Sequence, residues 1–316
     1  MDQRKSLRKM IAAEMATSAE SISDSQLSEF KIAVTRVLSP QASAILLDPE
    51  YGLEAARHRA ANCGLLMTYE VDGFENPRPN RMLALMPRIS VRRLHDLGAE
   101  AIKILLSYSP SDNETVNDEK RALIERIGSE CDSLAMPFLL EPVVYGAAGL
   151  DPQGFDFARI RPEMVVRTME EFSKPVYRVD VLKVEFPVNV SFVEESKVYA
   201  GRAAHTRAEA LAWYRAAASV ARVPYIYLSA GVNNAHFVAS LGLASEAGAR
   251  YSGVLCGRAN WQGGVARYAS GGVEALTAWL MDEGTRNMRS VNECLQAATP
   301  WTEWLENSLS VEAPLA

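Results

Sequence analysis

The chain has 316 residues, 48% of them hydrophobic and 23% charged, which is typical of a globular protein and excludes a disordered or fibrous one. Its formal net charge of −6 argues against general binding to nucleic acid or to an anionic membrane, because affinity for phosphate groups needs a basic surface. No apolar run follows Met1 as in a signal peptide, and none approaches the ~18 residues that span a bilayer, so we expect a cytoplasmic protein.

Short apolar runs alternate along the chain with longer segments of helical periodicity. This alternation predicts an α/β fold in which a parallel sheet is covered by helices. The runs are rich in Ile, Leu and Val, as strands covered on both faces should be. They comprise residues 44–48, 64–70, 101–108, 137–145, 179–188, 224–231 and 252–259.

Helix signals fill the intervals between these runs. Thr206 and Glu209 form a capping box ahead of a helix over residues 210–221. Ser90 is a candidate cap for a short helix that ends at Gly98. Further helical stretches follow the last strand, at residues 273–281 and 291–307.

The overall architecture that fits this pattern is a (β/α)8 TIM barrel. No repeat, low-complexity segment or linker divides the chain, so we predict a single domain over residues 1–316 with extra C-terminal helices. A closed barrel of this type needs eight strands, and only seven runs are found. We therefore expect the first strand to be truncated or missing at the N-terminus, with Asp2 near its end.

Two of the eight lysines lie inside apolar strands, Lys103 in Ala-Ile-Lys-Ile and Lys183 in Val-Leu-Lys-Val-Glu. Lysine is rarely buried without a partner, and burial disfavours the ammonium form, which makes the amine a nucleophile toward a ketone. Two such lysines facing one cavity would suit Schiff-base formation. The structural alternative is that each one pairs with a carboxylate, for which Glu141 and Glu185 are available.

Glu141 ends the run Pro-Phe-Leu-Leu-Glu. The carboxyl ends of barrel strands form the face where active sites gather. Imine chemistry needs a group that moves protons, so Glu141 is a candidate general acid and base. An ordinary solvated or salt-bridged carboxylate is the alternative.

The last two apolar runs end in small residues and one arginine, whose side chain is always positively charged. Exposed backbone amides, a hydroxyl and a guanidinium can together hold a phosphate, and the loops after the last two strands of TIM barrels often do so. We predict a phosphate site there. Its candidate residues are Ser229, Gly231, Gly257 and Arg258.

Histidine and cysteine spacing does not suggest a metal site. The four histidines fall outside the predicted strands, and the four cysteines include no Cys-x-x-Cys pair. We therefore expect neither a metal ion nor a cofactor.

Several blocks of sequence resemble the class I tagatose 1,6-bisphosphate aldolases, to which the sulfofructosephosphate aldolases are related. The likeness extends over nearly the whole chain. The blocks are Asp2-Gln3-Arg4, Leu-Leu-Asp-Pro-Glu-Tyr-Gly at 46–52, Lys103, Glu141, Leu-Lys-Val-Glu at 182–185, Leu-Ser-Ala-Gly-Val at 228–232 and Cys-Gly-Arg-Ala at 256–259.

The resemblance implies a metal-free lyase that cleaves a ketose 1,6-bisphosphate into dihydroxyacetone phosphate and glyceraldehyde 3-phosphate. It implies that Lys183 forms the imine and that Glu141 is the acid and base. It also implies that Lys103 is a catalytic residue beside the reacting centre, where its charge stabilises the oxyanion. Asp2, Gln3 and Arg4 would bind a substrate hydroxyl or phosphate, and Asp2 is also a catalytic candidate. The dihydroxyacetone phosphate end would be bound by Ser229, Gly231, Gly257 and Arg258.

Two alternatives remain open at this point. One keeps the imine chemistry and changes the substrate to 6-deoxy-6-sulfofructose 1-phosphate, and the other is a non-catalytic sugar-phosphate-binding regulator on the same barrel. We expect no nucleic-acid or membrane partner. A homodimer or higher oligomer is a reasonable expectation, with Trp301 and Trp304 as candidate interface anchors.

Overall fold

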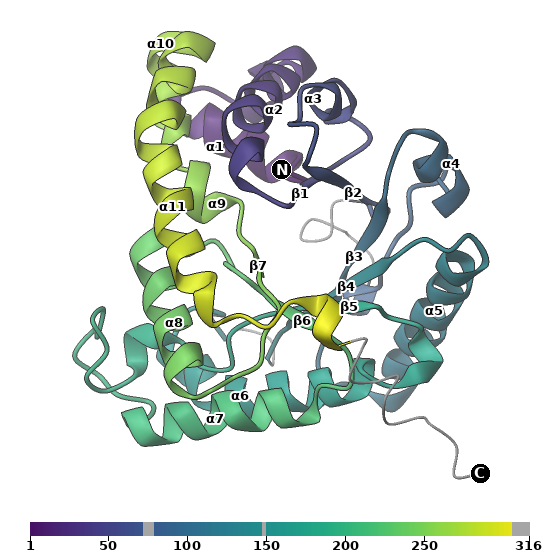
Figure 1. Ribbon diagram of the computed structural model, residues 1–316, viewed down its shortest axis with the longest axis vertical. Helices are drawn as coiled ribbons and strands as arrows, with labels where there is room; N and C mark the ends of the chain where they lie inside the picture. Colours follow the sequence, from purple (N-terminus) through teal and green to yellow (C-terminus); the bar gives the residue numbers. More distant parts are fainter. Residues whose placement is uncertain (72–78, 147–149, 305–316) are drawn as a thin grey trace. The chain divides into compact units, whose positions relative to one another are not determined.

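The computed structural model describes residues 1–71, 79–146 and 150–304. Figure 1 traces its elements in chain order. The strands are β1 (Ala44–Leu47), β2 (Gly64–Thr68), β3 (Ala101–Tyr108), β4 (Phe138–Val144), β5 (Val181–Val184), β6 (Tyr225–Leu228) and β7 (Val254–Leu255). The α-helices are α1 (Lys5–Glu14), α2 (Asp24–Leu38), α3 (Leu53–Arg57), α4 (Val91–Asp96), α5 (Glu114–Ser133), α6 (Phe155–Phe172), α7 (Arg207–Val220), α8 (Asn234–Glu246), α9 (Arg258–Trp261), α10 (Gly264–Trp279) and α11 (Thr285–Cys294).

The predicted α/β fold of the TIM-barrel class is confirmed. Strands alternate with helices, and the paired strands run parallel, β1 with β2 and β2 with β3, then β4 with β5, β5 with β6 and β6 with β7. All seven predicted strands are present among the described residues. Parallel pairing brings the carboxyl ends of neighbouring strands to the same edge, which is where the polar candidate residues follow them.

The described chain forms two compact units. Unit 1 contains residues 1–106, 129–138 and 257–291, and unit 2 contains the other described residues. The single domain expected over residues 1–316 stays a prediction.

In unit 1, helix α2 packs against large aromatic side chains of the core. The helix begins with a capping box, because Ser23 Oγ accepts the amide of Gln26 at 3.3 Å while the Gln26 side chain accepts the amide of Ser23 at 2.9 Å. Phe30 on this helix makes edge-on contacts with Trp261 and Tyr268, at centroid distances of 5.6 and 5.4 Å. These contacts join the first helices of the chain to α9 and α10.

In unit 2, α6 and α7 lie side by side (Figure 1). Pro162 lies within α6 and has no amide hydrogen to donate to the carbonyl of Ala158, four residues earlier. The ring nitrogen Nε2 of His205 lies 3.0 Å from that carbonyl and donates in its place. His205 therefore completes the hydrogen bonding of the helix.

The structure differs from the predicted elements mainly at their ends. The predicted strands included residues that leave the sheet, so β5 covers four residues and β7 two. Residues 1–3 belong to no strand. The helix expected over 291–307 is divided into α11, which begins at Thr285 and ends at Cys294, and a helical turn at residues 301–304. Positions 305–307 of that helix prediction lie outside the described residues. In the described part of the chain, no helix has the length and apolarity needed to cross a membrane.

Candidate active site

Lys183 and Glu141 form a buried ion pair on neighbouring strands of unit 2. The register of β4 and β5 places Leu140 beside Leu182, so the next residue of each strand comes side by side as well. Lys183 Nζ lies 2.8 Å from Glu141 Oε1, and each side chain is only 7% exposed. The pairing combines the predicted nucleophile and the predicted acid and base in one hydrogen bond.

A second buried pair holds the carboxyl ends of these two strands. Glu185, two residues after Lys183, accepts the backbone amide of Val144 at 2.8 Å through Oε2. Its other oxygen forms an ion pair with Arg161 of α6. One carboxylate thus ties β4, β5 and α6 together next to the Lys183 pair.

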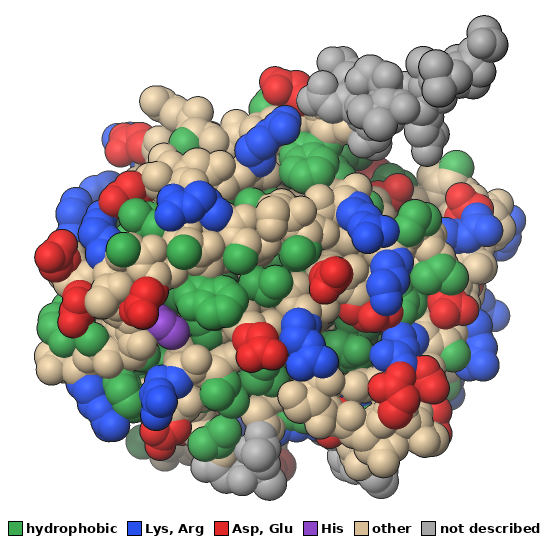
Figure 2. All heavy atoms as spheres, turned by 90° about the horizontal axis from the view of Figure 1, so that it is seen from below, with side chains coloured by type: hydrophobic (Ala, Val, Ile, Leu, Met, Phe, Trp, Pro, Cys, Tyr) green, Lys and Arg blue, Asp and Glu red, His purple; other side chains and the backbone are tan. Residues whose placement is uncertain are grey.

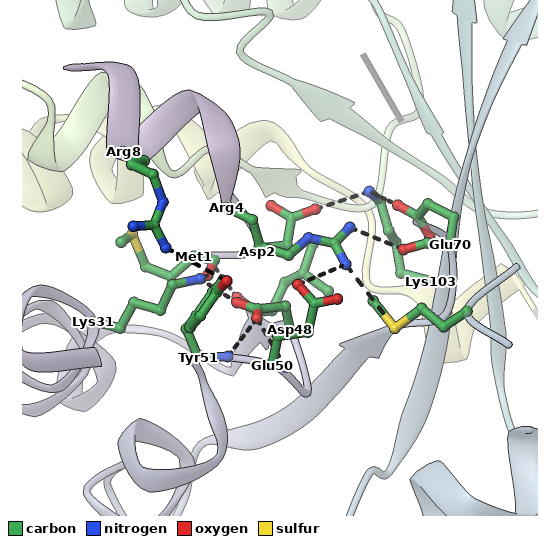
Figure 3. A network of polar contacts seen from close by, with 12 residues as sticks. Met1, Asp2, Arg4, Arg8, Lys31, Asp48, Glu50, Tyr51, Glu70 and Lys103 are labelled. Atoms are coloured by element: carbon green, nitrogen blue, oxygen red, sulfur yellow. Dashed lines mark hydrogen bonds and ion pairs between the residues drawn. The ribbon is translucent and has the colours of Figure 1, made fainter. Parts of the chain in front are cut away.

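Lys103 lies in unit 1, at the centre of the polar cluster drawn in Figure 3. Its ammonium donates to Asp2 Oδ2 and to Glu70 Oε1, both at 2.9 Å. The Lys103 side chain is 1% exposed. The predicted residues Asp2 and Lys103 therefore do meet, and Glu70 joins them.

Arg4 is buried in the same cluster, and its guanidinium contacts other residues of the protein. Its guanidinium donates to the carbonyl of Glu70 at 2.9 Å and lies 3.9 Å from the carboxylate of Glu50. Arg4 Nε, Gln3 Oε1 and Glu70 Oε2 are buried without a hydrogen-bond partner among the described residues. Buried polar atoms without a partner are costly, so these atoms suit a hydroxylated ligand that would satisfy them.

Figure 3 also shows an ion pair that sequence reasoning did not identify. Lys31 on α2 pairs with Asp48, the residue after β1, and neither side chain is exposed. Lys31 also donates to the carbonyl of Met1 at 2.7 Å. The lysine therefore contacts the segment that leads into Asp2.

The first predicted phosphate loop has the backbone geometry of a tight turn, and the second leads directly into α9 at Arg258. After β6, Ala230 and Gly231 both have left-handed backbones, with φ of 48° and 78°, and Ser229 lines a small pocket beside them together with His236. After β7, a Cβ on Gly257 would lie 3.0 Å from Nε1 of Trp261. The loops belong to different units, so their cooperation in one phosphate site stays a prediction.

Several residues that shape these clusters were missing from the predicted site, among them Lys31, Asp48, Glu70, Arg161 and Glu185. Glu70 carried a signal, since it is an acidic residue that follows an apolar strand. Lys31 and Arg161 lie on helices where a basic residue is ordinary, and only the three-dimensional contacts distinguish them. No group of three His, Cys, Asp or Glu side chains within residues 1–71, 79–146 and 150–304 is arranged to hold a metal ion.

A buried strand lysine paired with a carboxylate places an amine beside a proton acceptor, and enzymes that use an amine as nucleophile need both. Residues 1–263 match the DeoC/LacD family aldolase profile, and the chain belongs to this family of lyases.

Two curated relatives and one solved structure illustrate the likeness. The chain is 43% identical over 296 residues to tagatose 1,6-diphosphate aldolase 1 of Enterococcus faecalis, which covers 94% of this chain and 89% of the relative. It is 44% identical over 302 residues to tagatose 1,6-diphosphate aldolase 2 of the same organism, covering 95% and 89%. A fructose-bisphosphate aldolase from Plasmodium falciparum has a TM-score of 0.66 at 11% identity, covering 94% of this chain and 88% of that one, and shows that the fold is shared.

Proposed function

We propose that the protein is a class I aldolase that cleaves D-tagatose 1,6-bisphosphate into dihydroxyacetone phosphate and D-glyceraldehyde 3-phosphate. The observation that carries the proposal is the 2.8 Å contact between Lys183 Nζ and Glu141 Oε1. It supplies a nucleophile and a proton acceptor at one buried position, and imine catalysis of this cleavage needs both.

The reaction begins at the amine. Lys183 passes a proton to Glu141 and adds to the C2 carbonyl. Glu141 returns this proton to the carbinolamine hydroxyl, which leaves as water, so that a protonated imine and the Glu141 carboxylate remain. Glu141 then accepts the C4 hydroxyl proton as the C3–C4 bond breaks, which releases glyceraldehyde 3-phosphate and leaves the bonding electrons in an enamine. Protonation of C3 and hydrolysis of the imine release dihydroxyacetone phosphate and restore Lys183.

The remaining predicted residues enter the proposal as binding groups. We assign Asp2, Lys103, Gln3 and Arg4 to the hydroxyls or a phosphate of the substrate. In this cluster Gln3 Oε1 and Arg4 Nε are buried and have no hydrogen-bond partner among the described residues. We assign the phosphate of the dihydroxyacetone half to the loops that carry Ser229, Gly231, Gly257 and Arg258. Phosphate binding far from the breaking bond supplies energy that holds the reacting carbons in register.

Tagatose 1,6-bisphosphate is the proposed substrate because the curated relatives at 43% and 44% identity carry that name. A coupled assay that compares this bisphosphate with 6-deoxy-6-sulfofructose 1-phosphate tests the choice. We expect the larger kcat/KM for the bisphosphate. A larger value for the sulfonated sugar would replace the substrate and keep the chemistry.

Borohydride trapping tests the chemistry itself. Incubation with dihydroxyacetone phosphate and borohydride should give an irreversible adduct on Lys183, mapped by peptide mass, and Lys183→Ala should abolish it. A non-catalytic binding protein would bind dihydroxyacetone phosphate and form no adduct. An adduct on Lys103 instead would reverse the assignment of the two lysines.

A further inference from the structure

The ion pair between Lys31 and Asp48 lies deep in unit 1 and has a fixed set of contacts. Lys31 Nζ binds both Asp48 Oδ2 and the carbonyl of Met1. The other oxygen of Asp48 accepts the amides of Glu50 and Tyr51, at 3.0 and 2.8 Å. Both side chains are 0% exposed, so the network has little freedom to rearrange.

Stability alone does not account for such a pair. Removing two charges from water is costly, and buried ion pairs can often be replaced by uncharged residues with little loss of stability. The second partner of Lys31 suggests another role, because the carbonyl of Met1 belongs to the peptide bond that leads directly into Asp2.

We propose that Lys31 and Asp48 are positioning residues, which hold the segment Asp2-Gln3-Arg4 so that Asp2 meets Lys103. The segment is fixed at both ends. Lys31 holds the carbonyl before Asp2, and the guanidinium of Arg4 is bound to the carbonyl of Glu70. Between these points, Asp2 Oδ2 lies 2.9 Å from Lys103 Nζ (Figure 3).

The proposal rests on the proposed function, in which this segment binds the substrate. Loss of the Lys31 contact frees the segment and leaves Lys183 and Glu141 chemically intact. The defect should therefore fall on KM for the bisphosphate more than on kcat.

The decisive variant is the double replacement Lys31→Met with Asp48→Asn. It removes both charges together, and the amide oxygen of the introduced asparagine can still accept the amides of Glu50 and Tyr51. We expect a thermal midpoint close to that of the wild type, a KM for tagatose 1,6-bisphosphate raised about tenfold or more, and borohydride trapping of dihydroxyacetone phosphate on Lys183 retained. Lys31→Met alone should show the same KM together with a lower midpoint, since it leaves Asp48 charged and buried.

Lys120→Met is the matched control, because Lys120 is another fully buried helix lysine. It donates to Tyr145 at 2.8 Å and lies 3.6 Å from the carboxylate of Asp112. Its KM should stay within about twofold of the wild type. Wild-type KM in a folded double variant would overturn the proposal, and so would failure of the double variant to fold, because the pair would then be needed for stability. Absence of trapping in the wild type would instead reject the proposed function.

Discussion

At the residue scale, the proposed chemistry depends on the ion pair between Lys183 and Glu141. A protonated amine cannot attack a carbonyl, so the lysine must give up a proton to a group in contact with it. Glu141 lies within hydrogen-bond distance and is shielded from water to the same degree. The same carboxylate can then serve the C4 hydroxyl, so one group accounts for two proton transfers.

Replacement of Glu141 by Gln keeps the size of the side chain and removes the proton acceptor. We expect kcat for cleavage of the bisphosphate to fall by roughly 10²- to 10⁴-fold, the usual contribution of a general base. The measurement is steady-state kinetics with a coupled assay. Glu163→Gln, at a 70% exposed side chain on α6, is the control and should leave kcat unchanged.

The contradicting outcome for Glu141→Gln is specific. If kcat stays within a factor of about two while the variant folds normally, Glu141 only neutralises Lys183 and another group moves the proton. The salt-bridge alternative that the sequence left open would then be correct.

The residues of this pair could be predicted from sequence because both stand in or at the end of an apolar strand, where a charged side chain is unusual. Lys31 could not be. It lies in an amphipathic helix, and its partner Asp48 is 17 positions away. Recognising that pair requires knowing how α2 packs against the end of β1.

At the scale of elements, the seven strands could be predicted because each is a dense apolar run, but their ends could not. The apolar runs continue into residues that leave the sheet, as at Phe186 and Val188 after β5, which are buried without being strand. At the start of helix α1, the side chain of Arg4 makes no capping hydrogen bond. In α6, Pro162 has no amide hydrogen and interrupts the series of backbone hydrogen bonds. Neither helix therefore carries the usual signals at the sequence level.

Helix α6 is connected to the strands through the buried pair of Arg161 and Glu185, so Arg161→Met should be strongly destabilising. The change leaves a carboxylate buried without its cation, which costs about 3–5 kcal/mol. Urea unfolding measures the loss. Addition of Glu185→Gln should recover most of it, because glutamine is uncharged and can still accept the amide of Val144.

Arg286→Met is the matched control for Arg161→Met. Arg286 also pairs with carboxylates, Asp282 at 2.9 Å and Glu283 at 2.6 Å, but its side chain is 60% exposed. Exposed pairs contribute about 1 kcal/mol or less. If both arginine variants lose the same free energy of unfolding, the Arg161 pair does not anchor α6.

Two helix glycines should respond oppositely to alanine. A Cβ at Gly128 in α5 would lie 2.1 Å from the carbonyl oxygen of Tyr177, whereas a Cβ at Gly242 in α8 would meet nothing within 4 Å. We expect Gly128→Ala to lower the free energy of unfolding by about 1–3 kcal/mol through overpacking. Gly242→Ala should raise it by up to about 1 kcal/mol, because alanine favours the helix.

Thermal and urea unfolding of both glycine variants checks this pair of effects. A neutral result for Gly128→Ala would mean that α5 can move away from Tyr177 at no cost. That outcome would contradict close backbone packing between this helix and the turn before β5.

At the scale of the whole molecule, charges of both signs are mixed on the face that Figure 2 shows. Figure 2 shows Lys and Arg side chains interspersed with Asp and Glu across the face in view, in keeping with a net charge of −6. A polyanion needs a continuous basic surface instead. The side chain of Trp301 is 46% exposed, and its service as an oligomer anchor stays a prediction.

The stability of the whole chain should fall steeply in alkali, because both units bury tyrosines. Burial raises the pKa of Tyr69 in unit 1 and of Tyr251 in unit 2, each to about 12. Tyr214 and Tyr227, fully buried in unit 2, also have raised pKa values, again chiefly through burial. An unfolded chain ionises its phenols near pH 10, so between about pH 10 and 12 the folded state binds more protons than the unfolded state.

A state that binds more protons is disfavoured as the pH rises, so the free energy of unfolding should be nearly independent of these phenols below about pH 9 and should drop progressively above pH 10. Urea unfolding at a series of pH values, followed by tyrosinate absorbance, measures both the loss and its cause. The absorbance should appear together with unfolding, because the buried phenols ionise only when exposed. Tyr227→Phe removes one of these groups and should make the decline shallower, and an unchanged slope in that variant would mean that buried phenols do not set the alkaline limit.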